Sequence, residues 1–256
     1  MGGGPTDNHA IGAAETAAAD LLALKAKLRR LPDADRKAFA IGPEQLAAGY
    51  RALLLSAPKR KRPFFSSTRD GSAPADPAGR RREERLAMAW FNAGSLRLTD
   101  GGNIILLDYQ FPLKERQTNA GIGKVDLLGL DADQALVVIE LKVAGNREDR
   151  RIGLLEGLIY AAIVEANAQT ILPQLEAARG HRVIRARPNV FLMAPHDFWR
   201  GGFPPVKAME ALAMETGMLI GARISLFGFD NEDADFGLDG TRPAVYGGVL
   251  LSPARA

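Results

Sequence analysis

Two apolar runs, residues 124–130 and 135–142, constrain the fold of this chain more than any other stretch. A polar turn at residues 131–134 separates them. Runs of this length, rich in Val, Ile and Leu and divided by a turn, predict a β-hairpin. The residues directly before Glu140 are all apolar, which is typical of a strand buried on both faces. We therefore expect the hairpin to lie inside a sheet.

Charged residues interrupt both runs, Asp126 in the first and Glu140 with Lys142 in the second. Side chains two residues apart on a strand point to the same face, so Glu140 and Lys142 share one. If the hairpin pairs in register, Asp126 lies beside them. Burying these charges without partners is costly, and convergent carboxylates are suited to Mg²⁺ or Mn²⁺. The simpler alternative is a salt bridge between Glu140 and Lys142.

Composition excludes several classes of protein. The chain has 256 residues, 46% of them hydrophobic and 25% charged, so we expect a packed core. It contains no Cys, which excludes disulfides and thiolate metal sites and fits a reducing, cytoplasmic location. We see no signal peptide and no run of about 18 apolar residues, so no membrane contact is expected. The net charge of +3 permits nucleic-acid binding without arguing for it.

The first 79 residues are expected to form an N-terminal helical segment with a flexible linker, and residues 80–256 a separate domain. Apolar residues at helical spacing predict helices at 13–30 and 44–55. Ser, Gly, Pro and Asp dominate residues 66–79, which is typical of a linker. The N-terminal helices are candidates for a homodimer contact or for binding a protein partner.

A basic cluster lies just before the linker and is followed by Phe64 and Phe65. Four cations could contact phosphates while the two rings stack on bases. The alternative is a solvated hinge. The candidate nucleic-acid-binding residues of this cluster are Lys59, Arg60, Lys61 and Arg62.

The order of elements after residue 79 predicts an α/β fold. A patterned helix at residues 80–93 is followed by a strand at 102–113 and then by the hairpin. Consecutive strands followed by a crossover helix predict a mixed central β-sheet flanked by helices. Further elements are expected in the order helix, helix, strand, helix, strand and strand, at residues 152–166, 171–179, 189–194, 206–219, 223–229 and 245–251.

Several other stretches resemble known motifs but do not have the spacing that those motifs require. A phosphate-binding loop at Gly123-Lys124 would need Gly at position 118 and Ser or Thr at 125, where Thr118 and Val125 stand. The acidic run at residues 230–239 does not follow the calcium-loop pattern. The three His residues are scattered, without the spacing of a zinc site, and no nucleophile elbow is present.

The order helix with Glu, strand, strand with Asp, strand with Glu-x-Lys, helix, strand resembles the PD-(D/E)XK nucleases, which have the restriction-endonuclease-like fold. Asp126, Glu140 and Lys142 match the three residues of that motif, although Val125 stands in place of its Pro. The resemblance covers roughly residues 80–194. Glu83 resembles the acid that many members carry on the first helix, with Glu84 as the alternative.

The resemblance implies a metal-dependent nuclease with Mg²⁺ or Mn²⁺ as cofactor and nucleic acid, most often DNA, as substrate. Asp126, Glu140 and the carbonyl of Leu141 would be the metal ligands, and Lys142 would act on the attacking water and offset charge. Tyr160 matches a position on the following helix that contacts nucleic acid, and Glu156 stands where several members have Gln. The alternative is a catalytically inactive module that binds nucleic acid or a protein partner.

Overall fold

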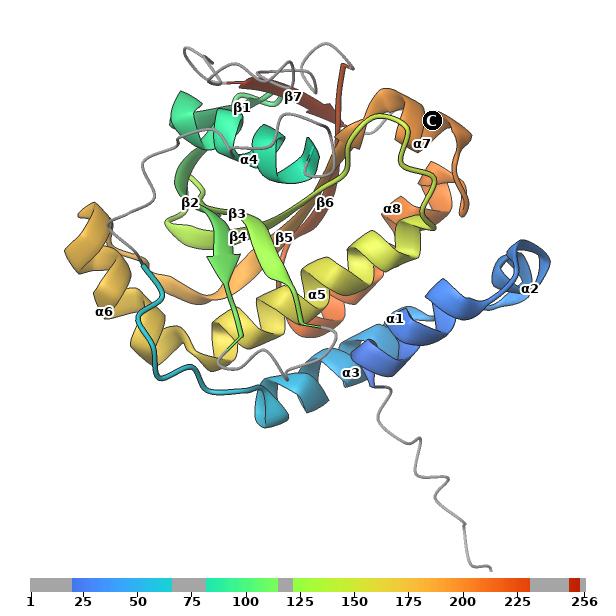
Figure 1. Ribbon diagram of the computed structural model, residues 1–256, viewed down its shortest axis with the longest axis horizontal. Helices are drawn as coiled ribbons and strands as arrows, with labels where there is room; N and C mark the ends of the chain where they lie inside the picture. The colour runs from blue at the N-terminus through green and yellow to red at the C-terminus, as the bar shows by residue number, and fades with distance from the viewer. Residues whose placement is uncertain (1–19, 66–81, 115–121, 231–248, 254–256) are drawn as a thin grey trace, which may run out of the picture.

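Helices lie against a curled mixed sheet in the computed structural model of this chain (Figure 1). It describes residues 20–65, 82–114 and 122–230, and the backbone of 249–253. The helices are α1 (Leu21–Arg30), α2 (Asp33–Ala38), α3 (Pro43–Ser56), α4 (Arg82–Ala93), α5 (Arg150–Ala166), α6 (Ala168–Arg179), α7 (His196–Gly201) and α8 (Val206–Ile220). The strands are β1 (Ser95–Leu98), β2 (Asn103–Pro112), β3 (Lys124–Leu130), β4 (Ala135–Leu141), β5 (Arg185–Pro195), β6 (Ile224–Phe229) and β7 (Val249–Pro253).

The strands of the sheet follow one another in chain order. Strands β1 to β4 are antiparallel neighbours, whereas β4, β5 and β6 run parallel. Strand β7 pairs with both β6 and β1, so the curled sheet closes on itself. The predicted α/β fold with a mixed sheet and flanking helices is confirmed. The expected linker at 66–79 and most of the acidic run at 230–239 lie outside the described residues, as do residues 13–19 of the first predicted helix.

The predicted hairpin is confirmed as β3 and β4. Its antiparallel register pairs Leu127 with Ile139 and Leu130 with Leu136. The turn is held by Asp131, whose Oδ1 accepts hydrogen bonds from the backbone N–H of Asp133 and of Ala135. This capping of free backbone donors is the usual role of Asp in a turn. The hairpin therefore places Asp126 directly across from Glu140.

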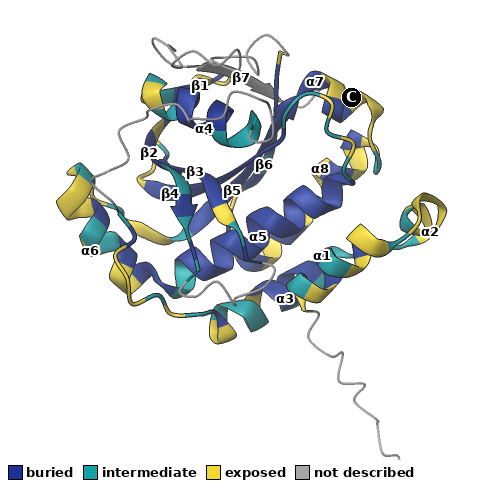
Figure 2. Ribbon diagram, in the orientation of Figure 1, coloured by how far each residue is buried: buried dark blue, intermediate teal, exposed yellow. Residues whose placement is uncertain are grey.

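The two faces of the sheet pack into separate hydrophobic clusters. On β4, Leu136 and Val138 belong to the cluster beneath α5, while Val137, Ile139 and Leu141 belong to the cluster beneath α4. Helix α5 is buried along most of its length, as its dark blue ribbon shows (Figure 2). By the alternation of strand side chains, Glu140 falls on the α5 face. The site therefore lies between the sheet and α5.

The N-terminal helices belong to the same core as α5. Leu21, Leu24 and Leu28 of α1 are buried in the cluster that α5 covers, together with Leu46 and Tyr50 of α3. Figure 1 shows both helices running alongside α5. The division expected at residue 79 follows the linker composition but does not follow the packing. No helix among the described residues is long and apolar enough to cross a bilayer.

Candidate active site

The carboxylate of Asp126 is fixed by one neighbour on each side. Its Oδ2 accepts a hydrogen bond from the backbone N–H of Leu141 at 2.9 Å, and its Oδ1 accepts one from Gln110 Nε2 at 3.0 Å. The strand register sets Glu140 opposite Asp126. Both acids are buried, with 9% and 5% of their surfaces exposed. The sequence-predicted pair of carboxylates is therefore brought together.

Gln110 reaches Asp126 from an unusual backbone conformation. Its φ is +48°, and left-handed backbone is uncommon for a residue other than Gly. The register of β2 pairs Tyr109 with Leu127 and Phe111 with Val125, so Gln110 lies across from Asp126. Such backbone persists where surrounding structure over-determines it, often at functional sites. Sequence reasoning missed Gln110 because no residue pattern reveals a left-handed position at a strand interior.

Lys142 is the centre of a buried ion network. Its Nζ donates to Glu140 Oε1 at 2.9 Å and to Glu156 Oε2 at 3.0 Å, and lies 3.2 Å from Glu148 Oε2. Only 5% of Lys142 is exposed. The salt bridge between Glu140 and Lys142 that the sequence left open is therefore present, within a larger cluster that includes the predicted site residues.

Helix α1 supplies two further cations to this network. Arg29 lies 2.9 Å from Glu156 Oε1 and 3.0 Å from Glu148 Oε1, and Lys25 Nζ lies 3.6 Å from Glu156 Oε1. Glu156 thus contacts cations from α1 and from the end of β4. Neither Arg29 nor Lys25 was expected at the site, because α1 lies far from the hairpin in the sequence.

Burial and charge pull the pKa values of these groups apart. Burial raises the pKa of Asp126 to about 7, and burial together with Asp126 and Glu156 raises that of Glu140 well above its usual range. Burial also raises the pKa of Glu156, but Lys142 outweighs it and lowers that pKa to about 2. Burial lowers the pKa of Lys142, but Glu140, Glu156 and Glu148 outweigh it and raise that pKa well above normal.

A cavity of about 440 Å³ opens onto these groups. Glu83 of α4 lines it, and its Oε1 accepts a hydrogen bond from Asn146 Nδ2 at 3.4 Å, whereas Glu84 does not line it. This resolves the choice between the two acids in favour of Glu83. Tyr160 of α5 also lines the cavity, beside Gly123, where an added Cβ would meet the Tyr160 hydroxyl at 2.3 Å.

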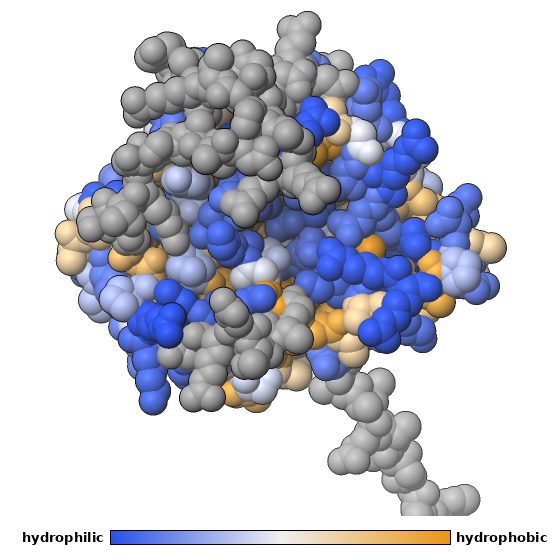
Figure 3. All heavy atoms as spheres, in the orientation of Figure 1, coloured by the Kyte–Doolittle hydropathy of each residue, from blue (hydrophilic) through white to orange (hydrophobic). Residues whose placement is uncertain are grey.

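The cavity wall is strongly charged and polar. Figure 3 shows hydrophilic side chains gathered across the middle of the face seen in Figure 1. Sequence reasoning missed the residues that come from loops and from distant elements, since polar loop residues carry no periodic signal. These are Arg29, Gln110, Lys124, Asn146 and Glu148.

Asp126 and Glu140 would supply only part of the ligand set of a magnesium ion. Among the described residues, no group of three His, Cys, Asp or Glu side chains closes on one metal position. Mg²⁺ commonly uses one or two protein carboxylates and keeps several waters. Asp126 and Glu140 match that pattern. The expected third ligand is the carbonyl of Leu141. The backbone N–H of that residue donates a hydrogen bond to Asp126, and its side chain packs on the opposite face of the sheet.

The basic cluster before the linker lies away from this cavity. Lys59 donates to the carbonyl of Ala166, and Arg60 donates from its backbone to Asn167 Oδ1 at 3.0 Å, so both help to fasten the segment to α5 and α6. Phe64 is 1% exposed and stacks on Phe111. The expectation that Phe64 stacks on bases is wrong, because its ring is a core side chain.

Lys61 and Arg62 are exposed, so the prediction that they contact phosphates stays a prediction.

Comparison with protein-family models, with curated proteins and with solved structures finds no match for this chain.

Proposed function

We propose that this chain is a metal-dependent nuclease with a restriction-endonuclease-like core, which hydrolyses phosphodiester bonds of nucleic acid, with DNA as the expected substrate. The observation that supports it is the placement of Asp126 opposite Glu140, with the Lys142 ammonium 2.9 Å from Glu140, at an open charged cavity. Placing two carboxylates side by side in a buried sheet is costly unless they act together on a cation or a substrate.

Asp126 and Glu140 would hold Mg²⁺ or Mn²⁺, with the carbonyl of Leu141 as a further ligand. Carboxylate oxygens are the hard ligands these ions prefer. When bound, the ion would lower the pKa of a water and offset the charge of the phosphate. Glu83, at the cavity wall, would receive a hydrogen bond from a water in that shell.

Lys142 acts as a cation in this proposal and not as a base. Three carboxylates raise its pKa well above normal, so its ammonium keeps its proton at neutral pH. An ammonium preorganised at the cavity stabilises negative charge that develops on the phosphate in the transition state. Gln110 keeps the Asp126 carboxylate in place through its hydrogen bond to Oδ1.

A catalytically inactive module that binds nucleic acid or a protein partner is the second candidate. The observation that favours it is the ion network itself: Lys142, Arg29 and Lys25 already pair with the three acids Glu140, Glu148 and Glu156. A divalent cation must therefore rearrange the Lys142–Glu140 contact before it can bind between the acids.

Cleavage by the pure protein separates the two candidates. Plasmid, linear duplex, single-stranded DNA and RNA are each incubated with Mg²⁺, with Mn²⁺ and with EDTA. We expect metal-dependent cleavage by the wild type, and none by Glu140→Gln, which keeps the size of the side chain. Glu84→Gln, on the same helix as Glu83 but outside the cavity, is the matched control and should retain activity. Equal cleavage by wild type and Glu140→Gln would exclude the proposal.

A further inference from the structure

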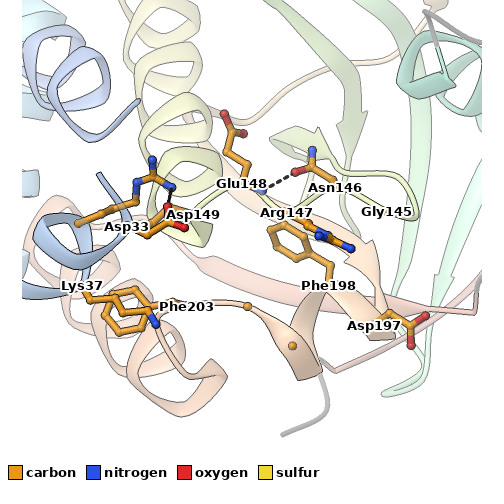
Figure 4. A pocket seen from close by; sticks show the side chains of 13 residues that line it. Asp33, Lys37, Gly145, Asn146, Arg147, Glu148, Asp149, Asp197, Phe198 and Phe203 are labelled. Atoms are coloured by element: carbon orange, nitrogen blue, oxygen red, sulfur yellow. Dashed lines mark hydrogen bonds and ion pairs between the residues drawn. The ribbon is translucent and has the colours of Figure 1, made fainter. Parts of the chain in front are cut away.

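A second cavity of about 430 Å³ adjoins the acidic one. It lies among α2, α7 and the loop before α5, and Figure 4 shows its lining side chains. Asn146 and Glu148 line both cavities, so the two adjoin along this loop.

The four acids that line this second cavity are all paired with arginines, three of which come from outside its wall. Each acid on its wall is within 3.2 Å of a cation, in the pairs Asp33–Arg36, Asp149–Arg151, Asp197–Arg200 and Glu148–Arg29. Lys37 of α2 and Arg147 of the loop are exposed, and neither pairs with an acid among the described residues. These two cations are therefore available to a phosphate.

Two aromatic rings supply an apolar surface in the same cavity. Phe198 of α7 is 7% exposed and belongs to the core, so its ring forms the floor of the cavity, whereas Phe203, shortly after that helix, is half-buried. Buried Arg150 fastens this segment by donating to the carbonyl of Phe198 at 2.7 Å. Gly201, where an added Cβ would meet nothing within 4 Å, leaves the wall open beside the rings. The rings are thus held in place by α5.

We propose that this cavity receives the nucleotide next to the scissile phosphate, with its base against Phe203 and its phosphate at Lys37 and Arg147. Aromatic rings beside cations are the combination that binds single-stranded nucleic acid without sequence preference. The volume is in the range of small-ligand pockets, about 300–1,000 Å³, and so suits one nucleotide better than a stacked duplex. The substrate is therefore a single strand or a duplex end whose base leaves the stack. The placement of this nucleotide next to a scissile phosphate rests on the proposed function, whereas its binding in the cavity does not.

Binding without metal tests the two cations. Fluorescent single-stranded DNA and RNA of the same sequence are titrated in EDTA with wild type, Lys37→Ala, Arg147→Ala and the double variant. We expect weaker binding in each variant and a salt slope reduced by about 1 for each cation removed. Lys207→Ala, an exposed lysine on α8, is the control and should bind as the wild type does. Unchanged affinity and slope in the double variant would overturn the proposal.

Removing the ring and the base together tests the stacking contact. Phe203→Leu is measured on an intact oligonucleotide and on a series with one abasic position moved along the strand. We expect wild-type affinity to fall by roughly tenfold at one abasic position, and the variant to lose most of that discrimination. Phe91→Leu, a half-buried ring on α4 that lines neither cavity, is the control. Equal discrimination in Phe203→Leu and wild type would contradict the stacking contact.

The binding experiments and the cleavage assay test the two proposals independently, because either proposal can be wrong while the other holds. Binding that depends on Lys37 and Phe203 in a protein that cleaves nothing would support the cavity and exclude the nuclease. Metal-dependent cleavage with the same KM in wild type and in Lys37→Ala/Arg147→Ala would support the nuclease and exclude the cavity. A continuous duplex bound more tightly than a single strand would also contradict the proposal.

Discussion

Lys142 holds together a cluster of acids that would otherwise repel one another. Three carboxylates surround its Nζ, and only 5% of the residue is exposed. Breaking a buried ion network by removing one partner typically costs about 3–5 kcal/mol. We expect Lys142→Met, which keeps the length of the side chain, to lower the free energy of unfolding by that amount in EDTA.

Divalent metal should restore part of this loss, because an ion between Asp126 and Glu140 replaces the missing positive charge. Thermal melts of Lys142→Met with and without Mn²⁺ measure the effect. Lys27→Met, on the exposed side of α1, is the matched control and should melt as the wild type does. A Lys142→Met melt that Mn²⁺ leaves unchanged, while it raises the wild-type melting temperature, would contradict this explanation.

Asp126 should make the stability of the metal-free protein depend on pH. Burial raises its folded-state pKa to about 7, from an ordinary value of 3.8. The folded state then binds this proton more tightly than the unfolded state, so stability is greatest below about pH 4 and is lost as pH rises towards 7. A shift of this size corresponds to about 4 kcal/mol at full ionisation.

We expect Asp126→Asn in EDTA to be more stable than the wild type at pH 8, with little difference at pH 4.5. Urea unfolding at several pH values measures both. Asp133→Asn, an exposed acid in the hairpin turn, should leave the pH profile unchanged. Parallel profiles for wild type and Asp126→Asn would show that this carboxyl is not the source of the pH dependence.

At this scale, the sequence predicted Asp126, Glu140 and Lys142 because strand alternation fixes which side chains share a face. It did not predict Glu148, since nothing local indicates that a loop residue turns back onto Lys142. Nor could it predict Arg29, whose contact with Glu156 depends on how α1 packs against α5.

Among the elements, α1 contributes to both the core and the site. Leu28 is fully buried there, whereas Leu55 on the neighbouring α3 is 88% exposed. We expect Leu28→Ala to destabilise the protein by about 2–5 kcal/mol through the cavity it leaves. Leu55→Ala should change stability by less than about 0.5 kcal/mol. Chemical denaturation of both variants measures the contrast, and equal effects would mean that α1 does not pack as described.

The long, strongly patterned elements were predicted from sequence, whereas three of the short ones were not. The predicted helix at 152–166 and the hairpin strands agree with α5, β3 and β4 within a few residues. The sequence analysis did not predict β1, α2 or α7, which are 4, 6 and 6 residues long. Elements this short contain too few turns or alternations to show a period, and tertiary packing decides their conformation.

The whole molecule should fold only with its N-terminal helices. The sequence led us to expect that residues 80–256 fold alone, because a linker precedes them. The shared core leads us to expect the opposite, since removing α1 and α3 exposes the apolar surface of α5. Expression of residues 80–256 should give an aggregated product or one without a cooperative melt. A monodisperse fragment with a cooperative melt would show that the N-terminal helices are an addition to a complete fold.

The antiparallel neighbours β2 to β4 and the parallel strands β4 to β6 follow from consecutive strands and then crossover helices, and in that respect the sheet was predictable. The closure of the sheet through β7 was not, because strand pairing between distant segments leaves no local pattern. The packing of α1 and α3 beside α5 was hidden for the same reason.

Binding of Mn²⁺ by the isolated protein tests the central claim most directly, because it reports on the Asp126–Glu140 pair without any substrate. Electron paramagnetic resonance of free Mn²⁺ measures the bound fraction during a titration. We predict saturable binding by the wild type, strong weakening in Asp126→Asn and in Glu140→Gln, and wild-type binding by Glu84→Gln. A wild type that binds no Mn²⁺, or variants that bind as tightly as the wild type, would contradict the metal site and the nuclease built on it.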